Sequence, residues 1–234
     1  MEINSQQTNI NFKTNIKFIS PDDFGRLKHS ILKSGFSKNY ISEYKILKTN
    51  KKSMQCYRVN NSKCCTTGIR TCVGIIAANP AEKKSSFFAH IFHSNENLRQ
   101  LCSIKPFING KNAIIIGQRR DKYEASSKIF DSLEAGCKAK NMPLTIMRGL
   151  RFGYETDAAY DGDTDTMFLC VSRIYNKKKY VSNFEKLKFA FLDIKIAPCD
   201  NVEFLKLDSI KEQNGMFQLF NKMNNLWQKL TKPN

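Results

Sequence analysis

The sequence predicts an α+β protein: a β-sheet or β-sandwich core with flanking helices, and extra helices at both termini. Short apolar segments rich in β-branched residues recur through the middle of the chain, separated by turn residues, as in sheet proteins. Segments with the three- and four-residue apolar spacing of amphipathic helices precede, interrupt and follow them. The 234 residues are enough for one domain with a substantial core. We expect a core over residues 61–175, an N-terminal extension over 1–60 packed on it, and a C-terminal strand and amphipathic helix over 176–234 in the same domain.

The N-terminal extension is expected to contain one clearly marked helix. Residues 1–15 are polar and rich in Asn and Gln, which is typical of a frayed lead. The helix should begin at Ser20, which can cap it, with Pro21 at its first position and acidic residues in its first turn. It should end at Gly35. Residues 44–59 predict one or two strands.

Two apolar segments, residues 71–78 and 86–93, predict an antiparallel hairpin, because the residues between them are turn formers. If the turn is centred near Ala81, Cys72 lies directly opposite His90. Side chains opposite each other have Cβ atoms roughly 4.5–5.5 Å apart, within reach for a nucleophile and its base. We therefore expect a cysteine and a histidine to meet on adjacent antiparallel strands.

His93 is not expected to share this site. Successive side chains of a strand point to opposite faces, so His90 and His93 should lie on different faces of the hairpin. The predicted pair is Cys72 and His90.

The remaining elements follow from the same patterns. Turn residues and apolar spacing predict, in order, a strand at 112–117, a helix at 126–140 with Cys137 on its apolar face, strands at 144–147 and 167–175, a basic turn at 177–179, a strand at 188–197 and an amphipathic helix at 209–230.

The chain is strongly basic, with 38 Lys and Arg against 21 Asp and Glu and a net charge of +17. Such a surplus favours acidic partners: nucleic acid, anionic lipid or an acidic protein face. No nucleic-acid-binding signature accompanies the charge, so we expect a protein partner and not nucleic acid. No apolar run approaches the roughly 18 residues of a membrane span, so no transmembrane segment is expected.

The cysteines indicate a reducing compartment. The chain is not small, and the segment after Met1 is not apolar, so neither a disulfide framework nor a classical signal peptide is expected. The eight cysteines are Cys56, Cys64, Cys65, Cys72, Cys102, Cys137, Cys170 and Cys199.

Two patterns that could suggest metal binding are better explained otherwise. Cys64 and Cys65 are adjacent and lack the paired CxxC spacing of a zinc site. The acidic run 161–165 lacks the glycine and the bidentate glutamate of a calcium loop, so it predicts an acidic hairpin turn. We expect no metal and no organic cofactor.

The residues around Cys72 resemble a known family signature. The motif consists of Thr66, Gly68, Thr71, Cys72, Val73 and Gly74, followed by Ala89 and His90. It resembles that of the CheD family, bacterial chemoreceptor glutamine deamidases, which belong with the catalytic domains of cytotoxic necrotising factor and related deamidating toxins. The resemblance implies a deamidase core over residues 61–175.

By this resemblance, Cys72 is the nucleophile, His90 the base and Thr66 the group that orients the histidine. The expected reaction is hydrolysis of a glutamine side-chain amide to glutamate and ammonia. A nearby His90 imidazolium would lower the pKa of the Cys72 thiol. The backbone N–H groups of Thr71 and Cys72 would stabilise the oxyanion.

The basic charge and the extra segments at both ends suit a bacterial toxin or translocated effector. Its partner would be a protein with an accessible glutamine on an acidic face. The expected location is the reducing cytosol of the producing cell or of a host cell.

Two other classes of function stay open. In one, the chain is a basic RNA- or anionic-lipid-binding module in which the cysteine and histidine only pack in the core. In the other, the same pair serves a different acyl-transfer enzyme: a protease, a transglutaminase or an N-terminal asparagine amidohydrolase.

Overall fold

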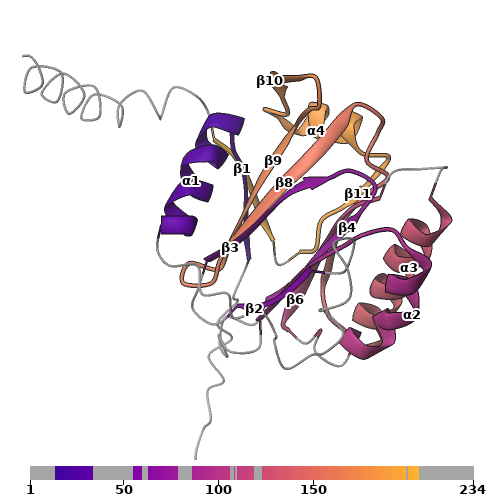
Figure 1. Ribbon diagram of the computed structural model, residues 1–234. Coiled ribbons are helices and arrows are strands. Elements are labelled where there is room, and N and C mark those ends of the chain that lie inside the picture. Colours follow the sequence, from indigo (N-terminus) through magenta and orange to yellow (C-terminus); the bar gives the residue numbers. More distant parts are fainter. Residues whose placement is uncertain are drawn as a thin grey trace, which may run out of the picture.

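The protein is described from a computed structural model covering residues 14–33, 55–59, 63–78, 86–105, 108, 110–118, 123–198 and 200–205. Two six-stranded sheets pack face to face, with helices on their outer faces (Figure 1). This confirms the predicted α+β class with a sheet core and flanking helices.

The elements, in chain order, are β1 (Asn15–Phe18), α1 (Pro21–Lys33), β2 (Gln55–Val59), β3 (Lys63–Ile69), β4 (Val73–Ala78), β5 (Ser86–Ile91), α2 (Asn95–Ile104), β6 (Asn112–Gly117), α3 (Glu124–Ala139), β7 (Leu144–Arg148), β8 (Tyr154–Asp161), β9 (Thr166–Arg173), β10 (Asn176–Tyr180), α4 (Phe184–Ala190), β11 (Asp193–Lys195) and β12 (Asn201–Phe204).

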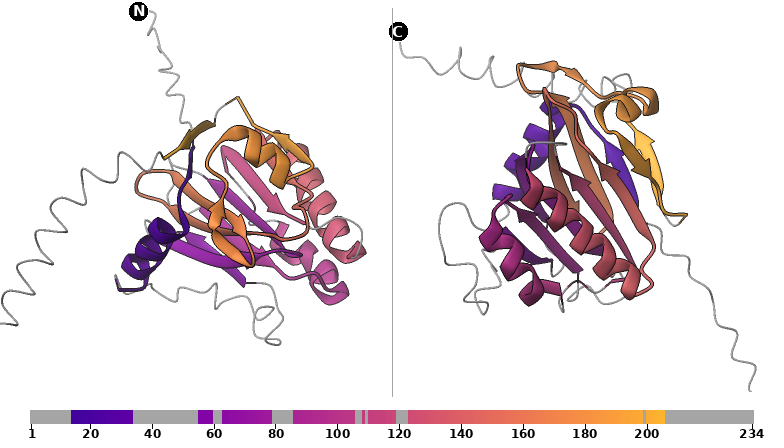
Figure 2. Two further views of the ribbon diagram at one scale, coloured as in Figure 1. Left: turned by 90° about the horizontal axis from the view of Figure 1, so that it is seen from above. Right: turned by 90° about the vertical axis from the view of Figure 1, so that its right-hand side faces the viewer.

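Sheet A has the strand order β12-β1-β9-β8-β3, with β10 also paired to β9. Sheet B has the order β11-β7-β6-β4-β5-β2. The N-terminal strand β1 lies inside sheet A, parallel to both β12 and β9. The views in Figure 2 show the two sheets stacked, with α1 and the pair α2 and α3 on opposite sides. The molecule therefore has four layers: helix, sheet A, sheet B, helices.

The main core lies between the sheets. It combines sheet A residues such as Ile16, Leu169 and Val171 with sheet B residues such as Ile76 and Ile114. A second cluster fills the space between sheet B and the helices α2 and α3, and a third packs α1 on sheet A. Because sheet B is covered on both faces, every residue of β4 and β6 is buried, which explains their continuous apolar runs.

Most predicted elements are present near their predicted positions. In α1, the Ser20 hydroxyl accepts a hydrogen bond from the Asp23 N–H at 3.2 Å, so Ser20 caps the helix as expected. The run 161–165 is the turn between the antiparallel strands β8 and β9, with Asp161 paired to Thr166. Of the frayed lead predicted at 1–15, residues 1–13 lie outside the described residues, but its end was wrong, because Thr14 is buried and Asn15 begins β1. The helix predicted at 209–230 lies outside the described residues.

Two predictions near the C-terminus were wrong. The expected strand at 188–197 is the helix α4 followed by the short strand β11. Asn183 caps α4 by accepting from the Lys186 N–H at 2.9 Å, and the buried Leu187 and Ala190 have helical spacing. The expected basic turn at 177–179 lies within strand β10, because the chain already reverses between Arg173 and Asn176, which pair with each other.

Among the described helices, none combines the length and apolarity that a membrane span requires.

Candidate active site

The predicted site lies where the chain passes from one sheet to the other. Strand β3 of sheet A ends at Ile69, and strand β4 of sheet B begins at Val73. The bend between them, residues 70–72, carries Cys72, whose exposed fraction is 7%. The strand expected at 71–78 thus begins two residues later than predicted, and Cys72 lies directly before it.

Thr66 and His90 meet across the two sheets. The Thr66 hydroxyl oxygen lies 2.6 Å from Nδ1 of His90, although Thr66 belongs to β3 and His90 to β5. Both side chains point into the space between the sheets, as do the buried neighbours Cys64 and Phe88. The imidazole ring is thus held from the opposite sheet by a short hydrogen bond.

The predicted pairing of Cys72 with His90 was wrong by two residues. His90 lies opposite Gly74, and Val73 pairs with Ile91. The reason is that the connection between β4 and β5 is centred one residue beyond Ala81. The shift conserves the faces of β4 and β5, but Cys72 itself lies in the bend before β4, and the pairing of the two strands begins at Val73. His90 therefore lies opposite Gly74, two residues after Cys72 in the chain.

Gly74 carries no side chain, and the side chains of Ile69 and Ile116 fill the space next to it. Gly74 stands directly opposite His90. A Cβ at Gly74 would come within 2.9 Å of Ile69 Cδ1 and 3.1 Å of Ile116 Cγ1, so the core packing itself requires a glycine here. Opposite His90, this face of β4 is therefore covered by Ile69 and Ile116 and not by a side chain of β4.

The expected thiolate–imidazolium pair is not the resting state. Burial lowers the pKa of His90 from 6.5 to about 4, so the ring is neutral at pH 7. Burial also raises the pKa of the Cys72 thiol, while the Thr71 hydroxyl and the backbone N–H groups of His93 and Arg70 act in the opposite direction. No hydrogen bond joins Cys72 to His90 among the described residues. The resting site holds a thiol and a neutral imidazole.

His93 lies on the other face and has its own threonine partner. The Thr71 hydroxyl oxygen is 2.8 Å from Nδ1 of His93. The His93 ring also contacts Tyr123, just before α3, with centroids 4.1 Å apart. The side chain therefore points toward α3. His93 lies beyond the end of β5, and Thr71, whose hydroxyl also acts on the Cys72 thiol, connects it to the bend.

Contacts from β6 and α3 hold the bend that carries Cys72. The Gln118 N–H donates to the Cys72 carbonyl at 3.0 Å, and the Ser126 hydroxyl donates to the Thr71 carbonyl at 2.5 Å. Gly117 has φ of +106°, and a Cβ there would lie 2.5 Å from the Cys72 carbonyl oxygen. The position of Cys72 thus depends on a close backbone approach that only glycine permits.

Two buried carboxylates of β8 hold the other side of the bend. Asp157 accepts the Gly68 N–H at 2.8 Å and fixes the bulge between Thr66 and Ile69. Glu155 binds the Arg70 guanidinium at 2.7 Å. Sequence analysis missed both acids, because nothing in an isolated strand shows what its side chains face. Gly117, by contrast, could have been suspected, because a glycine at the end of an apolar strand often marks a close backbone approach.

The two backbone groups expected to stabilise an oxyanion are available. Neither the Thr71 N–H nor the Cys72 N–H donates to a backbone or side-chain oxygen of the described residues. The Ser126 hydrogen bond to the Thr71 carbonyl orients the peptide unit that carries the Cys72 N–H, whereas the Gln118 bond to the Cys72 carbonyl orients the following unit, which carries the Val73 N–H. The bend can therefore present the Cys72 N–H as a fixed donor.

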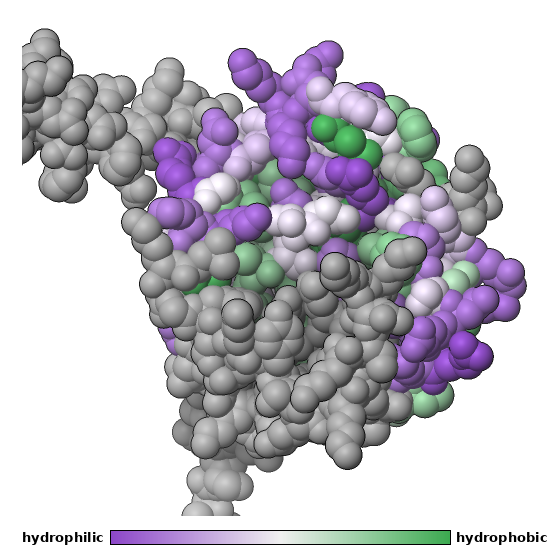
Figure 3. All heavy atoms as spheres, viewed as in Figure 1, coloured by the Kyte–Doolittle hydropathy of each residue, from purple (hydrophilic) through white to green (hydrophobic). Residues whose placement is uncertain are grey.

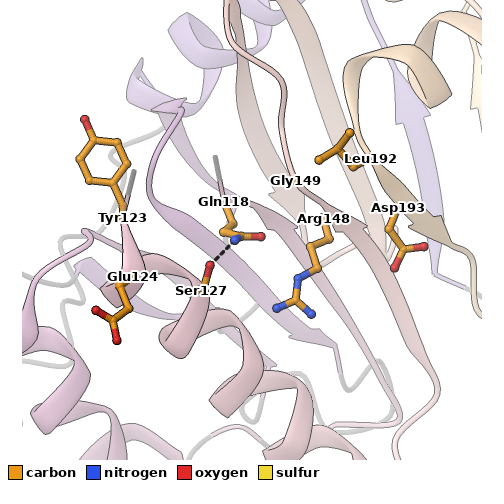
Figure 4. A pocket seen from close by; sticks show the side chains of 8 residues that line it. All are labelled: Gln118, Tyr123, Glu124, Ser127, Arg148, Gly149, Leu192 and Asp193. Carbon is orange, nitrogen blue, oxygen red and sulfur yellow. Dashed lines mark hydrogen bonds between the residues drawn. The ribbon is translucent and has the colours of Figure 1, made fainter. Parts of the chain in front are cut away.

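A polar pocket opens at the same end of sheet B, along the ends of β6, β7 and β11. Its volume is about 660 Å³. In Figure 4, Gln118 points toward Ser127 of α3, and Arg148 extends from the end of β7 into the same space. Gln118 links the pocket to the Cys72 carbonyl. The lining residues are Gln118, Tyr123, Glu124, Ser127, Arg148, Gly149, Leu192 and Asp193.

No protein-family model matches the chain, and no curated protein matches it significantly. Within the part of the chain that the structure describes, no group of three or more His, Cys, Asp or Glu side chains is arranged to hold a metal ion.

Proposed function

We propose that the protein is a cysteine-dependent protein glutamine deamidase, with Cys72 as nucleophile, His90 as base and Thr66 as the residue that orients the histidine. The observation that carries this proposal is the 2.6 Å contact between Thr66 and His90, a residue of the strand paired with β4, which begins directly after Cys72. A histidine that only packs in the core needs no hydrogen-bond partner from the opposite sheet. Here the partner is Thr66, the position at which the family motif has its orienting residue. The reaction uses no metal or organic cofactor.

The resting protonation states suggest a concerted first step. With its proton on Nδ1, shared with Thr66, the neutral His90 ring has a free lone pair on Nε2. The Cys72 proton moves to Nε2 as sulfur attacks the amide carbon, because the thiol does not ionise in advance. The N–H groups of Thr71 and Cys72 bind the oxyanion.

The second half of the reaction reverses these roles. His90 gives its proton to the leaving nitrogen, ammonia departs, and a thioester to Cys72 remains. Water then attacks the thioester and passes a proton to His90, which returns it to sulfur as the glutamate product leaves. Atoms and protons balance without any further reactant.

The substrate is proposed to be a protein with an accessible glutamine on an acidic face, since the net charge is +17. The pocket at the Gln118 end of sheet B could receive residues beside the target glutamine. We extend the proposal to a bacterial toxin or translocated effector that acts in a reducing cytosol.

The test is a comparison of the full chain with its Cys72→Ala variant, each incubated with a bacterial or host lysate. Peptide mapping by mass spectrometry should find glutamines converted to glutamates only with the wild-type protein, together with released ammonia. Cleaved or cross-linked products instead would indicate a protease or transglutaminase and overturn the proposal. Equal conversion by Cys72→Ala would exclude this nucleophile.

A further inference from the structure

Large apolar side chains are exposed together at one end of the sandwich. Tyr175 is 88% exposed, Phe152 77%, Phe189 55% and Leu192 42%. Figure 3 shows hydrophobic surface (green) among hydrophilic surface (purple) at the top of the view, over α4 and β10. Folded proteins rarely expose a cluster of this kind without a binding role.

These residues form one surface, although they come from three parts of the chain. Tyr154 pairs with Arg173, so the β7–β8 loop and the β9–β10 turn lie side by side, and the Ile174 N–H donates to the Gly153 carbonyl at 2.9 Å. The Arg151 N–H donates to the Ala190 carbonyl at 2.9 Å and ties the same loop to α4.

Aromatic contacts continue the surface. The Phe189 ring meets the Tyr154 ring with centroids 6.3 Å apart, and Leu192 packs against Gly149 at the end of β7. We call the set Phe152, Tyr175, Phe189 and Leu192 the apolar tip.

Cations surround the apolar tip and lie on its rings. The Arg151 guanidinium lies 5.1 Å from the centre of the Phe189 ring, and Arg173 lies 4.8 Å from that of Tyr154. On the neighbouring strand β10, Lys178 and Lys179 are exposed. These four cations have no ion pair with the described residues.

The nearby acids are already paired. Glu155 is buried and binds Lys177 and Arg70, Glu185 binds Lys188, and Asp193 binds Lys195. The surface around the apolar tip therefore carries a net positive charge that local carboxylates do not cancel.

We propose that the apolar tip and its surrounding cations bind the surface of an anionic phospholipid membrane. Exposed aromatic and aliphatic side chains on loop tips can enter the headgroup layer, while arginines and lysines around them contact the lipid phosphates. The charge complementarity is direct: four uncancelled cations face a negative surface.

The ring contacts favour lipid over nucleic acid. Nucleic-acid-binding proteins stack bases on open aromatic faces. Here Arg151 lies over Phe189, and Arg173 lies over Tyr154. One face of each ring is therefore already covered and cannot stack on a base. Leu192 adds an aliphatic contact that has no role in base stacking but suits the acyl boundary.

This inference goes beyond the proposed deamidase function and does not depend on it. Because Arg70 of the catalytic bend and Lys177 of β10 share Glu155, the lipid surface would lie close to the Cys72 site. The Cys72→Ala variant should nevertheless bind membranes as the wild type does.

The experiment measures co-sedimentation of the full chain with phosphatidylcholine vesicles, with and without roughly 30% phosphatidylserine. The wild type should bind only the anionic vesicles, and less tightly as salt is added. Lys178→Glu with Lys179→Glu should weaken binding by about 25-fold or more, since each lysine near the surface contributes about fivefold. Phe152→Ser with Tyr175→Ser should weaken it at unchanged charge.

The matched control is Lys128→Glu with Lys138→Glu on α3, an equal charge change at exposed sites outside this surface. If this control loses as much vesicle binding as the β10 variant does, the effect comes from net charge alone, and the proposal is overturned. So would wild-type protein that does not sediment with anionic vesicles, or that binds polyuridylate but no vesicles.

Insertion is tested separately with Tyr175→Trp in a Trp227→Phe background, which leaves one tryptophan at the tip. Brominated anionic lipids should quench its fluorescence. Unquenched fluorescence in sedimented protein would show that another segment, such as residues 206–234, makes the contact, and would also overturn the proposal.

Discussion

Thr66 and His90 are joined by a 2.6 Å hydrogen bond that spans the two sheets of the sandwich. The histidine belongs to the hairpin β4–β5, and its partner belongs to the strand that enters that hairpin. Any change in how the sheets pack would move the ring relative to Cys72. The chemistry proposed here is thus coupled directly to the packing of the core.

Removing this hydrogen bond should impair turnover more than substrate binding. We expect Thr66→Val to lower kcat by on the order of 100-fold with little change in KM, because the residue orients the base and does not touch substrate. Thr66→Ser, which keeps the hydroxyl, should retain most activity. Thr67→Ala at the exposed neighbouring position is the control, and an equal loss there would contradict the assignment.

Substitution of the nucleophile or the base should impair turnover, whereas substitution of His93 should not. Cys72→Ala should abolish turnover, and His90→Ala should lower it by roughly 10²–10⁴-fold, the usual contribution of a general base. His93→Ala should keep most activity, because its ring points toward Tyr123. Steady-state kinetics on an identified substrate decide this, with circular dichroism to show that each variant is folded. Loss of activity in His93→Ala alone would place the base on the other face.

The Cys72 thiol should show intermediate reactivity. At neutral pH, iodoacetamide should label the exposed Cys102 first, then Cys72, and the buried Cys137 and Cys170 last. Burial raises the pKa of Cys137 to about 11 and that of Cys170 to about 12, whereas hydrogen bonds to Cys72 offset part of its burial. Peptide mapping over time gives the order. Labelling of Cys72 no faster than Cys137 would argue that its sulfur is an inert core group.

Activity and stability should both depend on the neutral state of His90. Burial depresses its pKa from 6.5 to about 4, so the unfolded state binds the proton more readily. This contribution to stability is fully present above pH 6.5 and is lost as the pH falls toward 4. The acid limb of kcat/KM should likewise lie nearer pH 4 than 6.5.

Urea unfolding across this range, with His90→Gln as the comparison, measures the stability term. The variant should lose less stability than the wild type between pH 6.5 and 4. An acid limb of kcat/KM at pH 6.5 would mean that the imidazole titrates as if exposed.

Gly117 should be essential for the position of Cys72. Gly117→Ala places a Cβ 2.5 Å from the Cys72 carbonyl oxygen at a φ of +106°, so we expect a loss of about 1–3 kcal/mol in the free energy of unfolding and reduced turnover. Gly136→Ala in helix α3, where a Cβ meets nothing within 4 Å, should instead gain about 0.5–1 kcal/mol. Equal effects of the two substitutions on unfolding would rule out the close approach.

Local pattern alone predicted β4, β5, β6, β7, β9, α1 and α3 near their positions, together with the parity of the hairpin, but it missed β1, β3, α2, β8 and β12. Side chains alternate along every strand, so a register shift of two residues leaves the faces of β4 and β5 unchanged. Cys72 lies in the bend before β4, so its pairing with His90 stays a prediction. The helix α4 was missed because its apolar residues satisfy a strand pattern as well as a helical one, and only burial of Leu187 and Ala190 decides between them.

The sequence by itself determined the α+β class, the hairpin and the residues that can carry the chemistry. The tertiary structure alone decided that Gly74 and not Cys72 faces His90, that Asp157 and Glu155 hold the bend, and that burial keeps the imidazole neutral. It also brought Phe152, Tyr175 and Phe189 to one exposed surface. The physical reason is range: alternation and capping act within a few residues, whereas register, desolvation and exposure depend on segments far apart in the chain that meet only when the two sheets pack.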